Sequence, residues 1–316
     1  MVAVGNPADP QGAGAPPVID VTGLPVWGGL REASAADASV VVAGIPYDRS
    51  AVYRGGAAEA PAVIRRLSAV MPPVDERGRH LRDLTLHDLG DLDLGTSVEH
   101  GWPAVADRLA AVPPGAFLTV VGGDHCSVIP VLVAQARRHA GLAVLWVDAH
   151  PDLCDASRGG RWTVGCALRR AIELGGLDPR SIVLAGSRDF DAEEVVYARE
   201  RGVVVVTAAE LAAEPAAAIS RVTRALQGRR LHVSFDIDVL DPAFAPGTEV
   251  PSAGGLTTRE ALRLLETATR LSRPVGLDVC EVSPPLDQAG VTSLAALKVI
   301  FETWSRLPRP VSRGDG

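Results

Sequence analysis

Short, β-branched apolar segments alternate with segments of helical periodicity through most of this chain, and that alternation restricts the folds open to it. Eight apolar segments have the length and composition of strands: 38–45, 84–89, 116–122, 142–148, 181–187, 202–207, 230–236 and 273–279. Helical spacing appears between most of them, for example in 128–139, 208–227 and 258–271. Such alternation predicts an α/β fold, because right-handed crossovers place helices on both faces of a mainly parallel sheet.

Two architectures satisfy this alternation. The prediction is a three-layer αβα fold with an open, mainly parallel sheet of about eight strands, and its rival is a closed eight-stranded barrel. Residues 1–35 are rich in Gly, Ala and Pro and are expected to form an extended N-terminal arm. We expect residues 36–316 to form a single domain.

Composition argues against several classes of function. The formal net charge is −7 and no basic stripe with interleaved aromatic residues occurs, so we expect no nucleic-acid partner. No apolar run has the length of a membrane span and the N-terminus lacks the pattern of a signal peptide, so we expect a cytoplasmic protein with no membrane partner. The cysteines show no C-x-x-C spacing and are expected to be reduced thiols: Cys126, Cys154, Cys166 and Cys280.

Four of the predicted strands end in acids and histidines. These residues are Asp124 and His125, then Asp148, His150, Asp152 and Asp155, then Asp236, Asp238 and Asp241, and finally Asp278 and Glu281. In both architectures the active site forms at the carboxyl ends of the strands, so these side chains can converge on one crevice. A spacing of two residues, as in Asp148, His150 and Asp152, directs side chains to one side of an extended chain.

Several carboxylates side by side at the edge of a core indicate a cation, because unpaired carboxylates are costly to desolvate. Six of the residues are candidate metal ligands: His125, Asp148, His150, Asp152, Asp236 and Asp238. Six ligands are too many for one tetrahedral zinc ion, and an oxygen-rich set suits two ions of manganese, magnesium or iron. The other aspartates have a structural interpretation as hydrogen-bond partners of the ligands or as turn residues: Asp124, Asp155, Asp241 and Asp278.

Four motifs carry a family resemblance: "GIPYDRSAVYRGGAAEAPAVIRR", "GGDHCSV", "DAHPDLCD" and "SFDIDVLDPAFAPGTEVPSAGGLT". They resemble the sequence blocks of the ureohydrolase family, the manganese enzymes that include arginase, agmatinase and guanidino-acid hydrolases. The resemblance covers nearly the whole chain after the arm and implies an arginase-like catalytic domain with two Mn²⁺ per chain. The implied ligands are His125, Asp148, Asp152 and Asp236 for one ion, and Asp148, His150, Asp236 and Asp238 for the other.

The activity that this resemblance implies is metal-assisted hydrolysis of a guanidino group to urea and a primary amine. Asp152 would carry a proton to the departing nitrogen, and Glu281 would orient the substrate guanidinium by planar, bidentate pairing. The implied partners are a small guanidino substrate and further copies of the chain, in a trimer or hexamer. Two alternatives stay open: a metal-binding family member with little or no catalysis, and a hydrolase of a formimino group or another amidine.

The chain departs from the family pattern at three positions. Val164 stands before a glycine where many relatives have a histidine that is interpreted as a proton shuttle. Another group then moves protons, or turnover is slower, or solvent reaches the metals directly. Cys126 replaces the usual serine, and Val250 stands where threonine is frequent. For Cys126, Cys154 and Cys280, a role as small buried filler is a simpler interpretation than a thiol ligand or nucleophile.

Two loops suggest opposite chemistries for the far end of the substrate. Asp191 and Glu194, in "GSRDFDAEE", would face an amine. Arg158 and Arg161, in the loop after the "DAHPDLCD" block, would meet a carboxylate or stay solvated. Trp162 would form a wall over an aliphatic chain or pack against a neighbouring helix or subunit. The missing histidine and the glycine-rich opening "SRGGRW" lead to the hypothesis of an entrance remodelled for a guanidino compound longer than arginine.

Overall fold

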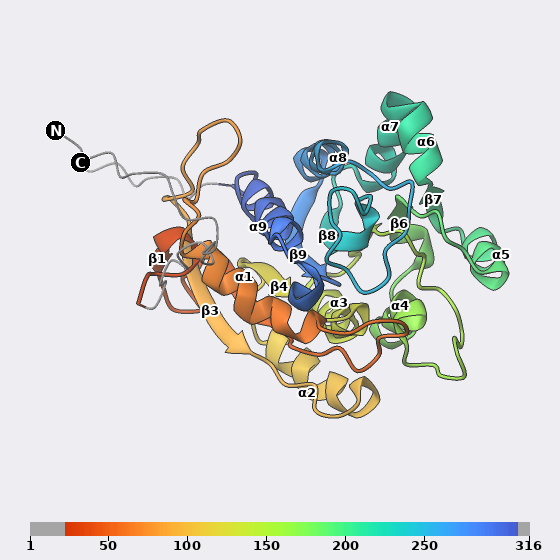
Figure 1. Ribbon diagram of the computed structural model, residues 1–316, viewed down its shortest axis with the longest axis horizontal. Coiled ribbons are helices and arrows are strands. Elements are labelled where there is room, and N and C mark those ends of the chain that lie inside the picture. Colours follow the sequence, from red (N-terminus) through yellow and green to blue (C-terminus); the bar gives the residue numbers. More distant parts are fainter. Residues whose placement is uncertain (1–22, 309–316) are drawn as a thin grey trace, which may run out of the picture.

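A nine-stranded sheet runs through the centre of residues 23–308, the part of the chain that the computed structural model describes (Figure 1). The strands are β1 (Arg31–Glu32), β2 (Val40–Gly44), β3 (Thr85–Asp91), β4 (Phe117–Val121), β5 (Ala143–Val147), β6 (Ile182–Ala185), β7 (Val204–Val206), β8 (Arg230–Asp236) and β9 (Arg273–Cys280). Their order is β1-β3-β2-β4-β9-β8-β5-β6-β7, and every pair of neighbours is parallel. Within the described residues the sheet is therefore open, with β1 and β7 at its edges. The predicted α/β fold is confirmed, and the rival barrel is wrong.

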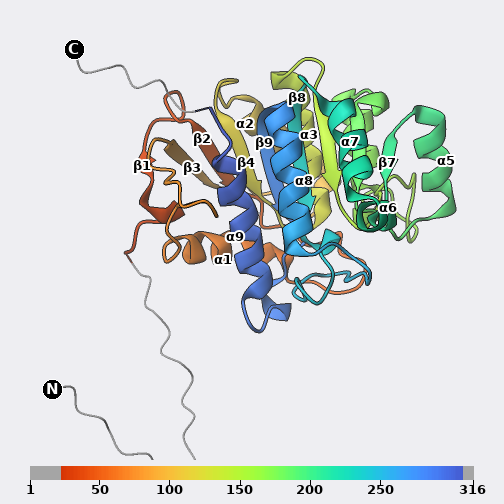
Figure 2. The same cartoon turned by 90° about the horizontal axis from the view of Figure 1, so that it is seen from above.

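Helices cover both faces of the sheet (Figure 2). The α-helices of the described residues are α1 (Ala60–Ser68), α2 (Val98–Ala110), α3 (Val128–Arg138), α4 (Ala167–Gly175), α5 (Ala192–Arg201), α6 (Ala208–Ala213), α7 (Pro215–Leu226), α8 (Thr258–Leu271) and α9 (Val291–Trp304). On one face α2, α3 and α4 pack side by side, and on the other lie α1, α9, α8 and α7. This is the three-layer αβα arrangement.

Strand β5 is apolar along its length because both of its faces are covered. In β5, Val144 and Trp146 face the core beneath α2, α3 and α4, whereas Leu145 and Val147 face the core beneath the other helices. All four side chains are fully buried. Continuous apolar strands of this kind are typical of parallel sheets enclosed between two helical layers.

The segment expected as an N-terminal arm contributes to the fold where it is described. Its residues Arg31 and Glu32 form β1, an exposed edge strand that the sequence did not predict, beside the eight that it did. Trp27 is buried in the core, and its indole N–H donates a hydrogen bond of 2.7 Å to Asp88. Residues 1–22 of the expected arm lie outside the described residues.

The segment 208–227, expected as one helix, is two helices, α6 and α7. Pro215 has no N–H group with which to continue a helix, but its fixed φ suits the first turn of a new one. The chain therefore ends α6 at Ala213 and starts α7 at Pro215.

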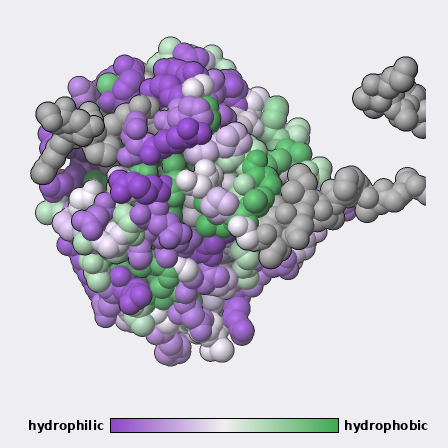
Figure 3. Space-filling view, turned by 90° about the vertical axis from the view of Figure 1, so that its left-hand side faces the viewer, coloured by the Kyte–Doolittle hydropathy of each residue, from purple (hydrophilic) through white to green (hydrophobic). Residues whose placement is uncertain are grey.

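The surface of the described residues mixes hydrophilic and hydrophobic side chains, as the face in Figure 3 shows. Large apolar side chains such as Tyr53 and Val195 are exposed, which is common in globular proteins. Among the helices of residues 23–308, none is both long enough and apolar enough to cross a membrane.

Candidate metal centre and active-site cleft

The four strands that end in acids and histidines are neighbours at the centre of the sheet. They stand in the order β4-β9-β8-β5, although they are far apart in sequence. Because all of them run in the same direction, their carboxyl ends bring these side chains to one edge of the sheet.

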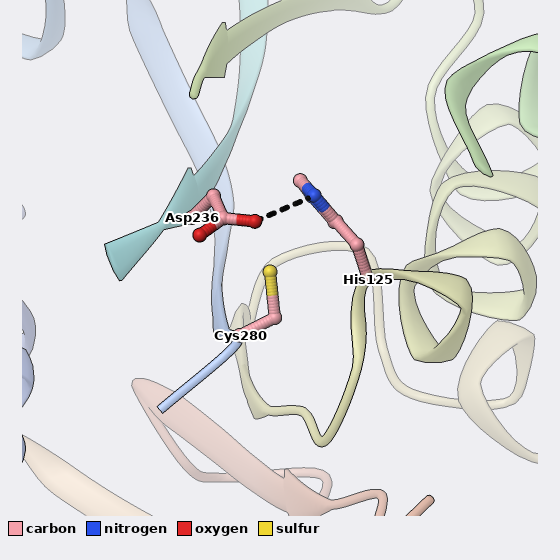
Figure 4. Close-up of side chains that lie close together, drawn as sticks. All are labelled: His125, Asp236 and Cys280. Carbon is pink, nitrogen blue, oxygen red and sulfur yellow. Dashed lines mark ion pairs between the residues drawn. The ribbon is translucent and has the colours of Figure 1, made fainter. Parts of the chain in front are cut away.

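His125 meets three carboxylates at this edge. It begins the short helix η3 (His125–Ser127), just after β4. Its Nδ1 atom lies 3.0 Å from Asp148 Oδ2 and 3.0 Å from Asp236 Oδ2, the second of which is drawn in Figure 4. Asp152 Oδ2 lies 3.2 Å from the same nitrogen. The imidazole stacks on Trp146 with 3.9 Å between ring centroids, so its orientation is fixed.

His150 forms the second half of the cluster. Its Nδ1 atom lies 3.0 Å from Asp238 Oδ2 and 3.5 Å from Asp148 Oδ1. Asp148 thus turns one carboxylate oxygen toward each histidine. A ligand shared between two ions needs this arrangement. All six predicted ligands are brought together in the cluster.

The donor atoms of the cluster fit divalent cations. His125 Nδ1 and Asp148 Oδ2 are buried and have no hydrogen-bond partner within the described residues. Ligand atoms about 2.1 Å from an octahedral ion lie about 3 Å from one another. The separations of 3.0 to 3.2 Å around His125 Nδ1 match that spacing. Two imidazoles and four carboxylates suit manganese better than a tetrahedral zinc ion.

The negative charge of the four clustered carboxylates also indicates a site for cations. Burial raises the pKa of Asp236 well above its usual range, and the negative charges of Asp238 and Asp148 raise it further. Burial and the charge of Asp148 raise the pKa of Asp152 to about 7. The four carboxylates would therefore not all ionise on their own at neutral pH, whereas two divalent cations would offset four negative charges.

A buried chain of hydrogen bonds orients His125 from behind. Its Nε2 atom lies 3.1 Å from the Ser234 hydroxyl oxygen. Ser234 in turn donates to Asp278 at 2.8 Å, and the other oxygen of Asp278 lies 2.7 Å from His232 Nε2. These contacts hold the ring with Nδ1 toward the carboxylates. Asp278 is thus a hydrogen-bond partner of a candidate ligand, as its structural interpretation predicts.

Asp124, Asp155 and Asp241 also lie outside the ligand cluster. Asp124 caps η3, because its carboxylate accepts the Cys126 N–H at 3.0 Å. Asp155 forms an ion pair of 2.9 Å with Arg170. Asp241 accepts N–H groups of the loop that follows it.

A cleft of about 290 Å³ adjoins the cluster. Four of the six predicted substrate residues line it: Glu281, Arg158, Asp191 and Glu194. Val164, at the position where relatives have a shuttle histidine, also lines the cleft. The valine side chain cannot accept or donate a proton, so the cleft wall has no proton-shuttle group at position 164.

Arg161 and Trp162 are not among the described residues that line the cleft. Arg161 forms ion pairs with Asp155 at 2.9 Å and with Glu173 at 3.8 Å. Trp162 packs against the core on the side of α2, α3 and α4. These neighbours support the structural interpretation of both residues.

Glu194 lines the cleft, but both of its carboxylate oxygens accept backbone N–H groups. One accepts the N–H of Leu153 at 2.8 Å, and the other accepts that of Asp191 at 2.8 Å and closes the capping box of α5. Asp191 itself is exposed and accepts the thiol of Cys154 at 3.5 Å. Of these two acids, Asp191 is the one more accessible to a substrate.

Several residues of the cleft wall were not predicted from the sequence. Val52, Ser157, Asp189 and Phe190 line it. Asp189 and Phe190 lie in the loop 186–191 between β6 and α5, so the rule that sites form after strands would have indicated them. Val52 lies in the first of the four family motifs and Ser157 in the segment "SRGGRW", but neither residue type indicated a place in the cleft wall.

Three residues of the cleft have left-handed backbone conformations that side chains other than glycine rarely adopt. They are Asp152 with φ of 53°, Arg158 with φ of 49° and Glu281 with φ of 62°. Apart from Trp27, they are the only non-glycine residues with positive φ among the described residues. Such strained positions cluster at functional sites, where the surrounding structure holds them.

The four cysteines are buried and form no disulfide within the described residues. Cys280 lies beside His125 and Asp236 (Figure 4). Burial raises the pKa of the Cys126 and Cys280 thiols well above the usual range, which keeps them neutral. Both fit the interpretation as small buried filler.

Comparison with known proteins identifies the family. Residues 38–305 match the model of the arginase family. The chain is 40% identical to proclavaminate amidinohydrolase of Streptomyces clavuligerus over 82% of its own length and 85% of that protein. It is 33% identical to the human mitochondrial guanidino acid hydrolase, over 84% and 77% of the two chains.

Solved structures agree with the sequence comparison. The Streptomyces clavuligerus proclavaminate amidinohydrolase structure superposes with a TM-score of 0.82 at 35% identity, over 89% of this chain and 96% of that one. Trypanosoma cruzi formiminoglutamase with Mn²⁺ superposes with a TM-score of 0.79 at 25% identity, over 87% and 96%. With the candidate ligands gathered at the strand ends, these matches lead to one conclusion. The chain belongs to the arginase family and is an amidinohydrolase, an enzyme that hydrolyses carbon–nitrogen bonds in linear amidines.

Proposed function

We propose that this enzyme uses two manganese ions to hydrolyse a guanidino acid to urea and a primary amine. The observation that carries the proposal is the composition of the cleft. The cleft is lined by residues of the ligand cluster, by the acid Glu281 and by one arginine, Arg158. Arg158 forms no ion pair within the described residues. A guanidino acid has the complementary charges, with a cationic guanidinium at one end and a carboxylate at the other.

The walls of the cleft suit the aliphatic chain between those two charges. Val52, Val164 and Val250 line it together with Phe190. Apolar side chains of this kind favour methylene groups over polar ones. The names of the relatives point the same way, since one acts on guanidino acids and another on proclavaminate.

The ligands proposed for the ions are His125, Asp148, His150, Asp152, Asp236 and Asp238. When bound, the two ions would acidify a water molecule and so supply the nucleophile at neutral pH. Glu281 pairs with the guanidinium and orients its carbon toward the cluster. Asp152, which lies 3.2 Å from His125 Nδ1 and lines the cleft, carries a proton to the departing nitrogen.

The test of this proposal is product release by the manganese-loaded protein over matched substrates. 4-Guanidinobutyrate and agmatine share the guanidino group and the aliphatic chain but end in a carboxylate and an amine. Guanidinopropionate, arginine and longer guanidino acids extend the series. We expect urea from the acids, with agmatine a poor substrate. Agmatine as the best substrate would contradict the guanidino-acid assignment, and formamide from a formimino compound without urea from any guanidino compound would redirect the proposal to that class.

A further inference from the structure

Glu249 lies opposite Glu281, although the ligand cluster makes no use of it. Thr248 pairs with Val282 in an antiparallel bridge. In an antiparallel pair the residue after one partner faces the residue before the other, so Glu249 faces Glu281. Like charges in such positions destabilise each other unless something compensates them.

The carboxyl group of Glu249 is fully buried and has only one conventional hydrogen bond. Its Oε1 atom accepts the N–H of Ala57 at 3.0 Å. Its Oε2 atom receives no hydrogen bond from an N–H or O–H group of the described residues, and the side chain contacts the carboxyl group of Glu281. Burial raises the pKa of Glu249 to about 7 and raises that of Glu281 well above its usual range.

Arg54 does not neutralise this pair of acids by direct contact. Its guanidinium donates to the backbone carbonyl oxygens of Thr248 at 2.6 Å and of Glu249 at 3.2 Å. The two carboxyl groups therefore contact each other without the Arg54 guanidinium between them.

Glu281 needs support from more than one side. Its Oε1 atom accepts the backbone N–H of His125 at 2.7 Å, which fixes one oxygen. Its backbone has the strained φ of 62°, yet the side chain lines the cleft. A second contact would prevent the carboxyl group of Glu281 from rotating about its hydrogen bond with the His125 N–H.

We infer that Glu249 is a positioning residue: its carboxyl group, anchored on the Ala57 N–H, contacts the carboxyl group of Glu281 and holds it toward the guanidinium. The inference rests on the proposed function, because it takes Glu281 as the guanidinium anchor. A braced carboxylate offers its two oxygens in one plane, which is the geometry that bidentate pairing with a guanidinium requires.

The test compares three variants with the wild type. Glu249→Gln keeps a donor and an acceptor in place, whereas Glu249→Met fills a similar volume without either. Thr248→Val is the matched control, because it removes a buried hydroxyl from the neighbouring residue, whose side chain points to the opposite side of the extended segment. KM and kcat for urea release from 4-guanidinobutyrate, bound metal and the melting temperature are measured on the same preparations. Glu249→Ala replaces the Met variant if the latter does not fold.

We expect Glu249→Met to raise KM by about 10- to 100-fold while the metal content stays at the wild-type value. Glu249→Gln should recover most of that loss, and Thr248→Val should match the wild type. An unchanged KM in Glu249→Met would overturn the inference. So would a loss in Glu249→Gln as deep as that in Glu249→Met, or an equal loss in Thr248→Val.

A second readout separates this inference from the proposed function. If the wild type releases no urea from any guanidino compound, the proposed function fails. Calorimetric titration of the metal-loaded protein with guanidinium chloride then decides on Glu249. The positioning role is supported if Glu249→Met binds guanidinium more weakly than the wild type and Glu249→Gln binds it about as well as the wild type. Equal affinity for guanidinium in all the proteins overturns that role.

Discussion

Arg158 and Arg161 are three residues apart on one loop, and their surroundings predict different roles. Arg158 lines the cleft, whereas Arg161 pairs with Asp155 and Glu173 at the surface. We expect Arg158→Ala to raise KM for 4-guanidinobutyrate by about 10- to 100-fold, because a charge-assisted contact contributes about 1.5–3 kcal/mol. KM for agmatine should stay near the wild-type value.

Arg161→Ala serves as the control for that prediction. The exposed ion pairs that it removes contribute about 1 kcal/mol or less to stability and nothing to the cleft. Steady-state kinetics of both variants on both substrates checks the contrast. A larger effect from Arg161→Ala than from Arg158→Ala would show that the carboxylate is bound elsewhere.

Residue identity predicted the ligand cluster better than it predicted the cleft. His125, Asp148 and Asp236 stood out because acids and histidines are unusual directly after buried strands, and strand ends meet at one edge. The left-handed backbone conformations of Asp152 and Glu281 could not be predicted, because the residue type alone does not determine φ. Glu249 was also missed, because its partner Glu281 is remote in sequence and meets it only through the fold.

The path of the loop between β4 and η3 requires a glycine at position 123. A Cβ atom at this position would lie 1.9 Å from the backbone oxygen of Tyr47, which accepts the Asp124 N–H at 2.7 Å. The Gly123 oxygen also accepts the N–H of Glu281 at 2.8 Å. Gly123→Ala must therefore displace the loop that carries His125. We expect it to lower manganese binding and activity by at least about tenfold, measured by metal analysis and urea release.

Gly115→Ala, in the turn before the same strand, is the matched control. A Cβ atom there meets nothing within 4 Å, and its φ is not in the left-handed region. This variant should bind metal and turn over like the wild type. Gly123→Ala behaving in the same way would contradict the account of the loop.

Among the secondary-structure elements, local composition predicted eight of the described strands but did not predict the edge strand β1. The eight expected strands carry apolar, β-branched residues that a parallel sheet requires on both faces. β1 consists of Arg31 and Glu32, which are exposed and have no pattern to detect. The break between α6 and α7 at Pro215 shows that one residue can override a continuous helical period.

The stability of the whole molecule should depend on pH through His139, which is not one of the candidate ligands. His139 is buried at the end of α3, and its Nε2 atom has no hydrogen-bond partner within the described residues. Burial, together with the charge of Arg138, lowers its pKa to about 4. Between the unfolded value near 6.5 and this folded value, the unfolded state binds a proton that the folded state excludes. Folding stability is therefore lost as the pH falls through that range.

His139→Leu removes this titration while keeping the site apolar. We expect the stability of the wild type relative to the variant to fall by about 1–2 kcal/mol between pH 7 and pH 5, at most about 1.4 kcal/mol per pH unit. Urea unfolding curves of both proteins at the two pH values provide the measurement. Parallel changes in the two proteins would show that His139 does not carry the effect.

We propose that the protein binds a pair of divalent cations where β4, β5 and β8 end. Metal content and urea release, measured together while manganese is titrated into metal-free protein, test it most directly. We predict that activity rises until about two ions are bound per chain. We also predict that Asp236→Ala loses both metal binding and activity, while Asp241→Ala, in a nearby turn outside the cluster, keeps them. Full activity without bound metal, or with Asp236 replaced, would contradict it.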